Sequence, residues 1–181
     1  MMYLRWLAAL GLSIAITSAA APLLAASPEQ VHIEDADTLL VEIEGVSYRI
    51  QLVGIDAPES SMNPKLQRDM ERTGLSAEVL QALGLAADRR LRELLVEFHP
   101  YQLLFDPQRK DRYGRTPGDL IDAHGTLLSL RLVQEGYAIP VGPPAQQEKK
   151  LQEAANVARK TTRGLWLSHP DAVRAWATPR H

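Results

Sequence analysis

The stretch YRIQLVGIDAPES, residues 48–60, decides the fold. It begins as an alternating run rich in strand-forming residues and ends in a turn that holds Gly54, Pro58 and two carboxylates, Asp56 and Glu59. Branched and aromatic side chains favour strands, whereas glycine and proline mark the residues at which a strand ends. The sequence therefore predicts a strand that delivers two acidic side chains to a rigid turn, where they are placed to do chemistry.

Working outward, five strands are predicted, over residues 30–33, 38–43, 47–55, 98–105 and 116–121. Glu44-Gly45 forms the hairpin turn between the second and third strands. About three helices accompany the strands, over residues 76–97, 127–135 and 144–162, and residues 64–72 form a further charged helix or an ordered loop. We predict an α+β fold with a β-barrel core, namely a five-stranded Greek-key barrel of the OB type.

The first 26 residues combine a short basic start with an uncharged, apolar run, which predicts a secretory signal. Small residues offer cleavage after Ala20, Ala21 or Ala26, and the polar stretch from Ser27 favours Ala26. One domain is then expected over residues 27–168, followed by a C-terminal tail over residues 169–181. The protein is expected to be secreted or periplasmic. The alternative is an uncleaved anchor, because about 20 apolar residues can span a bilayer.

Composition limits the function. The chain has no cysteine, so an exported protein of this kind is held by its hydrophobic core and not by disulfides. Without Arg5 of the leader, 19 basic and 22 acidic residues remain, a formal charge of −3. The basic surface of a tight DNA-coating protein is therefore missing. An enzyme that uses a divalent cation brings positive charge to the phosphate itself, so weak, transient binding of DNA or RNA remains compatible.

The candidate metal ligands are Asp37, Asp56 and the backbone carbonyl of Ala57. Both aspartates fall at strand ends, where a hard cation such as Ca²⁺ can take one oxygen from each. The alternative for either aspartate alone is a turn-capping role, which is common in β proteins. Asp35, two residues before Asp37, is either a supporting acid or a turn former.

Two further residues have the chemistry of a phosphodiesterase. Glu59 follows Pro58, whose fixed φ holds the carboxylate at a defined angle, as suits a general base. Arg115 offers a planar guanidinium that matches two phosphate oxygens. The alternatives are a solvated turn carboxylate for Glu59 and, for Arg115, a loop arginine paired to Asp106 or Asp111.

Four motifs occur in series: Asp35-x-Asp37-Thr38, Gly54-Ile55-Asp56-Ala57-Pro58-Glu59, Asp111-Arg112-Tyr113-Gly114-Arg115 and Gly164-Leu165-Trp166. In order and spacing, residues 31–166 resemble the thermonuclease (staphylococcal nuclease-like) family. The resemblance implies an OB-fold phosphodiesterase that uses calcium to hydrolyse DNA and RNA, leaving a 3′-phosphate. It also implies Asp37, Asp56 and the Ala57 carbonyl as metal ligands, Glu59 as base, and Arg115 as the group that stabilises the transition state.

Three departures from the family pattern are visible. Gln51 stands where the family usually has a second catalytic arginine, and an amide carries no charge to offer the phosphate. Arg49 lies two residues earlier on the same strand face and is the candidate replacement. Residues 61–76 are longer than the compact family loop and form either a lid or a solvated charged helix. Residues 139–144 lack the aromatic side chains that stack on bases.

Two hypotheses follow. The first is an exported, calcium-dependent nuclease acting on DNA and/or RNA, with activity reduced by Gln51. The second is a catalytically degenerate module that keeps the fold and binds nucleic acid, protein or an anionic ligand. The retained Asp37, Asp56, Glu59 and Arg115 favour the enzyme. The sequence does not distinguish DNA from RNA as substrate or one oligomeric state from another, and a membrane contact is expected only if the leader is uncleaved.

Overall fold

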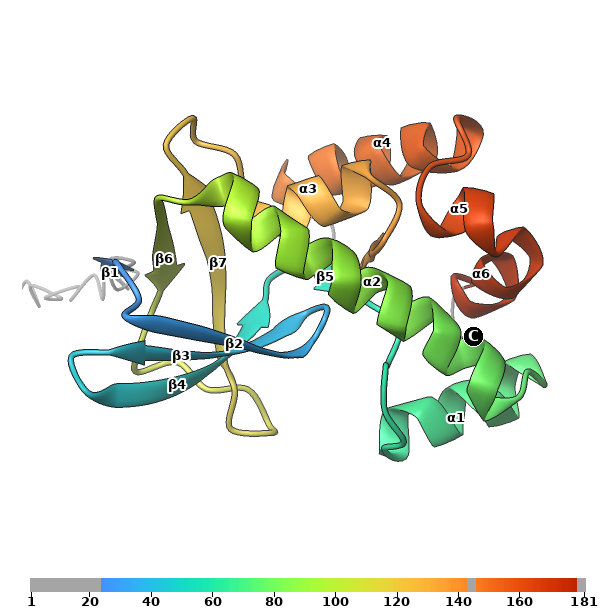
Figure 1. The fold of residues 1–181 in the computed structure, drawn as a ribbon, viewed down its shortest axis with the longest axis horizontal. Helices are drawn as coiled ribbons and strands as arrows, with labels where there is room; N and C mark the ends of the chain where they lie inside the picture. Colours follow the sequence, from blue (N-terminus) through green and yellow to red (C-terminus); the bar gives the residue numbers. More distant parts are fainter. Residues whose placement is uncertain (1–23, 143–145, 179–181) are drawn as a thin grey trace, which may run out of the picture.

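The computed structural model describes residues 24–142 and 146–178. Its main sheet has the strand order β1-β6-β7-β4-β3-β2, and all neighbours are antiparallel except the parallel pair β4 and β7. The strands are β1 (Leu24–Ala26), β2 (Gln30–Asp35), β3 (Thr38–Ile43), β4 (Val46–Leu52), β6 (Tyr101–Phe105) and β7 (Thr116–Asp122). A separate pair joins β5 (Ile55–Asp56) to β8 (Ile139–Pro140). Figure 1 shows the sheet bent around one end of a long helix.

The helices are α1 (Pro64–Thr73), α2 (Ala77–Phe98), α3 (Leu128–Gln134), α4 (Gln146–Lys160), α5 (Leu165–Ser168) and α6 (Pro170–Trp176). Ser76 caps α2, since its side chain accepts a hydrogen bond from the Val79 amide. In Figure 1, α2 runs from the sheet to the group of α1, α5 and α6. None of the helices in the described ranges is long and apolar enough to cross a membrane.

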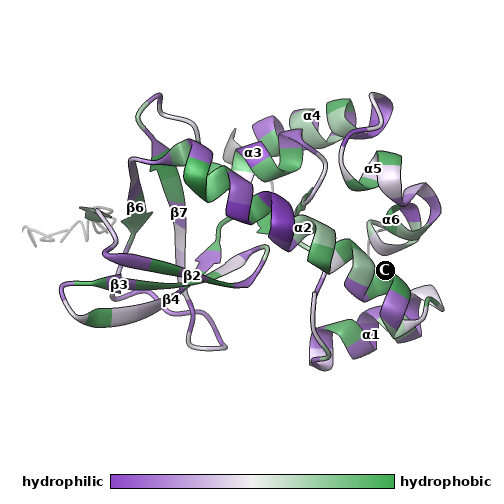
Figure 2. Ribbon diagram, viewed as in Figure 1, coloured by the Kyte–Doolittle hydropathy of each residue, from purple (hydrophilic) through white to green (hydrophobic). Residues whose placement is uncertain are grey.

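Helix α2 contributes to two hydrophobic cores. Its C-terminal half, with Leu91, Leu94 and Phe98, packs against buried side chains of the sheet, α3 and α4. Its N-terminal half, with Leu80 and Leu83, packs against α1, α5 and α6. Figure 2 shows hydrophobic and hydrophilic residues interspersed along α2, as expected for a helix with buried and exposed faces. One helix therefore fixes the barrel relative to the helical layer.

The predicted α+β fold with an OB-like barrel core is confirmed, although the sheet does not close, because β1 and β2 remain its two edges. The strand predicted over residues 47–55 is interrupted after Leu52, where Gly54 takes a φ of +73° and the chain turns to pair with β8. The strand predicted from residue 98 begins at Tyr101, because Phe98 continues the buried face of α2. Strand β1 lies within the predicted leader and pairs with β6.

The structure differs from two predictions, the C-terminal tail and the number of helices. Residues 170–176 are not a tail but helix α6, whose Val173 and Trp176 are 1% and 3% exposed. Arg72 of α1 donates hydrogen bonds to the carbonyl oxygens of Ala175 (3.2 Å) and Trp176 (2.8 Å) at the end of α6. With α1, α5 and α6 added, the helices exceed the three or so that were expected. Short helices without a long amphipathic repeat leave only a weak sequence signal.

Trp176→Ala should destabilise the protein by about 3 to 5 kcal/mol, because it removes a large buried side chain from the core shared by α1, α2 and α6. Leu167→Ala on α5 is the matched control, since Leu167 is 71% exposed and should change stability by less than about 0.5 kcal/mol. Urea denaturation of both variants measures the difference. Equal stability of Trp176→Ala and the parent would show that residues 169–181 are a dispensable tail.

Asp119 of β7 is a buried acid away from the motifs. Its carboxylate accepts hydrogen bonds from the Ser129 amide (3.2 Å) and the Ser129 hydroxyl. Burial raises the pKa of Asp119 to about 7, although these hydrogen bonds act in the opposite direction. Folding thus extends the pH range in which Asp119 is protonated, from below about 4 to below about 7.

The raised pKa of Asp119 predicts a pH-dependent loss of stability. The stabilising contribution is fully present below the ordinary pKa of about 4 and is lost as the pH rises to about 7. Asp119→Asn keeps an acceptor and a donor for Ser129 without the charge, so its stability relative to the parent should rise by roughly 2 to 4 kcal/mol between pH 4 and pH 8. Urea unfolding across this range tests it, and parallel pH profiles for the two proteins would contradict it.

Candidate functional site

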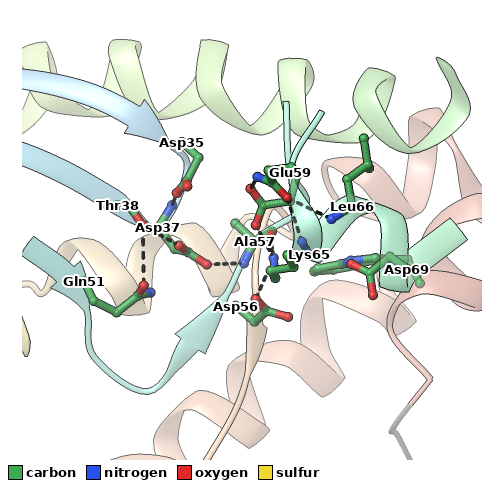
Figure 3. Close-up of polar contacts among 12 residues, drawn as sticks. Asp35, Asp37, Thr38, Gln51, Asp56, Ala57, Glu59, Lys65, Leu66 and Asp69 are labelled. Carbon is green, nitrogen blue, oxygen red and sulfur yellow. Dashed lines mark hydrogen bonds and ion pairs between the residues drawn. The ribbon is translucent and has the colours of Figure 1, made fainter. Parts of the chain in front are cut away.

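The turn between β2 and β3 meets the turn after β5 through Asp37. The Ala57 amide donates a hydrogen bond to Asp37 Oδ2 (2.8 Å), and the Thr38 hydroxyl donates one to Asp37 Oδ1 (3.0 Å). Asp35 Oδ1 accepts a hydrogen bond from the Asp37 amide (3.1 Å). Figure 3 shows Asp37, Asp56 and Glu59 gathered around these two turns. Two motifs that are 20 residues apart in sequence are therefore one site in space.

Gly84 of α2 sets the position of Glu59. A Cβ atom at residue 84 would lie 2.3 Å from the carbonyl carbon and oxygen of Glu59 and 2.4 Å from the amide nitrogen of Ser60. The backbone of this turn therefore rests directly on the helix, which only glycine permits. Glu59 is 6% exposed. This excludes the solvated turn carboxylate that was the alternative for Glu59.

The N-terminus of α1 closes the site from the other side. Asn63 is the N-cap, and its side-chain oxygen accepts hydrogen bonds from the Lys65 and Leu66 amides (2.9 Å each). The Asn63 side-chain nitrogen donates to Glu59 Oε2. Pro64 occupies the first helical turn, where its missing N–H is no loss. Residues 61–76 thus contain a helix, α1, whose N-cap Asn63 contacts the candidate base.

The Lys65 ammonium contacts two of the candidate metal ligands and the candidate base. Its ammonium nitrogen is 2.9 Å from Asp56 Oδ1, 2.6 Å from the Ala57 carbonyl oxygen and 2.7 Å from Glu59 Oε1. Figure 3 shows Lys65 between Asp56 and Glu59. Burial lowers the pKa of Lys65, but the nearby carboxylates of Asp56, Asp37 and Glu59 outweigh it and raise the pKa above its ordinary value. The lysine is therefore charged.

The carboxylates perturb one another. Burial, together with the negative charge of Asp37, raises the pKa of Asp35 to about 8. Burial also raises the pKa of Asp56, against the opposing effect of Lys65. Such an acidic cluster, here Asp35, Asp37, Asp56 and Glu59, is stable only if a proton or a cation offsets its charge.

The candidate ligand atoms are of the chemical type that a hard cation prefers. Asp37, Asp56 and the Ala57 carbonyl supply only oxygen, which is the donor that calcium prefers, and an ammonium ion already lies on two of them as a stand-in cation. Over the described residues, no group of three or more acidic or histidine side chains has metal-binding geometry. A cation here would thus rely on two carboxylates, a carbonyl and waters.

Arg115 lies in the turn between β6 and β7. Its Nε donates to Asp111 Oδ2 (2.8 Å), which is one of the two partners that the sequence suggested. The guanidinium carbon lies 5.4 Å from the centre of the Tyr113 ring, and Tyr113 is 56% exposed. Within the described ranges, neither Nη nitrogen of Arg115 forms a hydrogen bond. The Asp111 contact orients the guanidinium and leaves its outer edge available to an anion.

Gln51 and Arg49 differ in what they contact. Gln51 Oε1 lies 3.4 Å from Thr38 Oγ1, so the amide lies beside the residue that follows Asp37. Arg49 forms an ion pair with Glu34 of β2 instead, through both Nε and Nη2. Arg49 thus lines the same groove but is paired with Glu34, and its role as a replacement for the missing arginine stays a prediction.

All the predicted catalytic side chains line one open groove of about 1720 Å³. It contains Asp37, Arg49, Gln51, Asp56, Glu59 and Arg115. Helix α1 adds Lys65 and Arg68 to the wall, and residues 139–142 add no aromatic ring. The sequence did not predict the roles of Lys65, Asn63 or Gly84. A glycine inside a helical repeat is a signal of close backbone packing, but the direction of the Lys65 side chain had no sequence signal.

Comparison with known proteins shows which family the chain resembles. A family model described as staphylococcal nuclease homologue matches residues 49–168. Micrococcal nuclease of Shigella flexneri is 30% identical over 159 residues, which cover 82% of this chain and 77% of that protein. Thermonuclease of Staphylococcus hyicus is 24% identical over 138 residues, 75% of this chain and 73% of that protein.

Endonuclease YhcR of Bacillus subtilis (strain 168) is 28% identical over 140 residues, which cover 75% of this chain but 11% of that longer protein. The chain thus matches most of two compact relatives and a small part of a large one. The matched residues include β4 from Arg49 onward, the turn with Asp56 and Glu59, Lys65 and Arg115. These matches, together with the OB-like barrel, establish that the chain belongs to the staphylococcal nuclease homologue family.

Proposed function

We propose that this protein is an exported, calcium-dependent nuclease that hydrolyses phosphodiester bonds of DNA or RNA. One observation carries the proposal: Asp56, the Ala57 carbonyl and Glu59 converge on a single cationic group, and Asp37 is hydrogen-bonded to the same turn. The relatives named nuclease or endonuclease support the reaction type. A site that binds a cation beside a buried general base can promote phosphodiester hydrolysis.

Each residue has a definite chemical task in this reaction. Glu59 accepts the proton of the attacking water, and the Asn63 hydrogen bond keeps its carboxylate oriented. Arg115 donates hydrogen bonds to the phosphoryl oxygens as negative charge grows on them. Calcium, when bound by Asp37, Asp56 and the Ala57 carbonyl, supplies positive charge to the same oxygens. Gln51 supplies only a neutral donor, so the rate should be lower than with a charged donor.

The second candidate is a binding module without catalysis, and a specific observation favours it. Arg49 is paired with Glu34, and Gln51 has replaced the arginine expected beside the cluster. The groove therefore has one fewer charge for the transition state than the family pattern implies. The two candidates differ in one measurable property, which is cleavage of nucleic acid in the presence of calcium.

We also propose export, on the basis of the apolar leader with its basic start. Strand β1 affects the choice between the candidate cleavage sites. Its residues Leu24–Ala26 pair with Phe105, Leu104 and Leu103 of β6, so cleavage after Ala26 would remove a strand from the sheet. Cleavage after Ala20 or Ala21 keeps β1, and we prefer these sites over Ala26.

Purified protein should cleave single-stranded DNA or RNA with calcium and not with a chelator. Gln51→Arg should raise the rate at least about tenfold, because a charged donor replaces a neutral one, whereas Glu59→Gln and Arg115→Ala should lower it at least about 100-fold. Arg49→Ala is the matched control for Arg115→Ala, and it should change the rate less than about threefold because the hydrogen bonds of Arg49 go to Glu34 and not to the catalytic residues.

Gel-based cleavage assays measure these rates, with calorimetry to establish that calcium binds. If calcium binds but neither the parent nor Gln51→Arg cleaves either substrate, the protein is the binding module. If Arg49→Ala is as damaging as Arg115→Ala, then Arg49 has taken the role of the missing arginine despite its contact with Glu34.

The mature protein should begin at residue 21 or 22 outside the cytoplasm, because this start retains β1 on the edge of β6. Mass spectrometry of protein recovered from the periplasm or medium decides the start. A mature chain beginning at Ser27 would show that β1 is dispensable. A full-length, membrane-bound product would instead support an uncleaved anchor.

A further inference from the structure

Lys65 has no assigned role, yet it is the residue in closest contact with the proposed ligands. Its ammonium lies within 2.6 to 2.9 Å of Asp56, the Ala57 carbonyl and Glu59. Calcium–oxygen distances are about 2.3 to 2.6 Å. A calcium ion and the Lys65 ammonium therefore cannot contact Asp56 Oδ1 and the Ala57 oxygen together, since they would occupy the same volume and repel each other.

Lys65 occupies a position in α1 that is unfavourable for a lysine. It stands in the first turn, next to Pro64, where the helix dipole is positive and an acidic side chain is preferred. No acidic residue occurs in the first turn of α1. A lysine is unfavourable for the helix there, so the acidic cluster, and not the helix, accounts for its favourable placement.

The contact also engages the candidate base. Both oxygens of Glu59 have a partner, because Lys65 contacts Oε1 and the Asn63 side chain donates to Oε2. While Lys65 is in place, an attacking water has to compete with its ammonium for Glu59 Oε1.

We propose that Lys65 is an internal competitor of calcium, which sets the affinity of the cation site and releases Glu59 only when calcium displaces it. The inference rests on the proposed function. Binding of the cation and release of the base are then one exchange, in which an ammonium leaves the acidic cluster as a divalent ion enters. The long, flexible side chain of lysine allows this movement without unfolding α1.

Isothermal calorimetry with calcium tests the exchange. Lys65→Met keeps the length of the side chain without its charge, and it should bind calcium with a Kd at least about tenfold lower than the parent, because no ion pair has to break first. Arg68→Met is the matched control. It removes one positive charge from the same helix and the same groove, but Arg68 has no hydrogen bond or ion pair among the described residues, so its Kd should change less than about threefold.

Thermal unfolding gives a second readout. In chelator, Lys65→Met should unfold at a lower temperature than the parent, because Asp56 and Glu59 lose their cation, and calcium should raise its Tm more than that of the parent. If Lys65→Met does not fold, Lys65→Gln replaces it, since the amide retains a hydrogen-bond donor without the charge.

The outcomes separate this inference from the proposed function. A Kd that is unchanged or higher in Lys65→Met overturns the competition and leaves the calcium site in place, with Lys65 as a structural ion pair. An equal gain in Arg68→Met also overturns it, since the effect would then be general electrostatics. If no protein binds calcium, the parent included, the proposed calcium-dependent function and the inference both fail.

Discussion

The backbone contact between Gly84 and Glu59 is the constraint on which the rest of the site depends. Helix α2 belongs to both hydrophobic cores, so its position is fixed along its whole length. The turn that carries Asp56 and Glu59 lies against it with no room for a side chain at residue 84. Any shift of the helix is therefore transmitted to the carboxylates. A rigid support of this kind is what a candidate base needs to hold a defined orientation.

The electrostatics of the site follow from this fixed geometry. Four acidic side chains are held close together, so their repulsion cannot be relieved by moving apart. Three features reduce this repulsion. Asp35 has a raised pKa, Asp37 accepts hydrogen bonds from the Ala57 amide and the Thr38 hydroxyl, and Lys65 supplies a positive charge. One lysine beside four acidic side chains leaves the cluster short of positive charge, as suits a site that binds a cation.

The sequence predicted the barrel, the α2 cap at Ser76 and the meeting of Asp37 with the turn at Asp56. These depend on alternation, capping residues and short motifs, which are local properties of the chain. It did not predict that Arg49 would pair with Glu34 or that Lys65 would lie on Asp56. These depend on which of several side chains a long, flexible cation reaches, and that is decided by tertiary structure. Helix α6 was missed for a related reason, since Trp176 becomes a core residue only when α1 and α2 are in place.

Strand β1 has a consequence for the solubility of the protein. It covers the backbone of Leu103, Leu104 and Phe105 on the outer side of β6. Without β1, the N–H and C=O groups on that side would lack strand partners, next to two fully buried apolar side chains, Leu103 and Phe105. Exposed strand edges of this kind are templates for pairing with another chain. If the leader is removed as proposed, a shift of about five residues in the cleavage site would decide whether the sheet presents a protected edge or an aggregation-prone one.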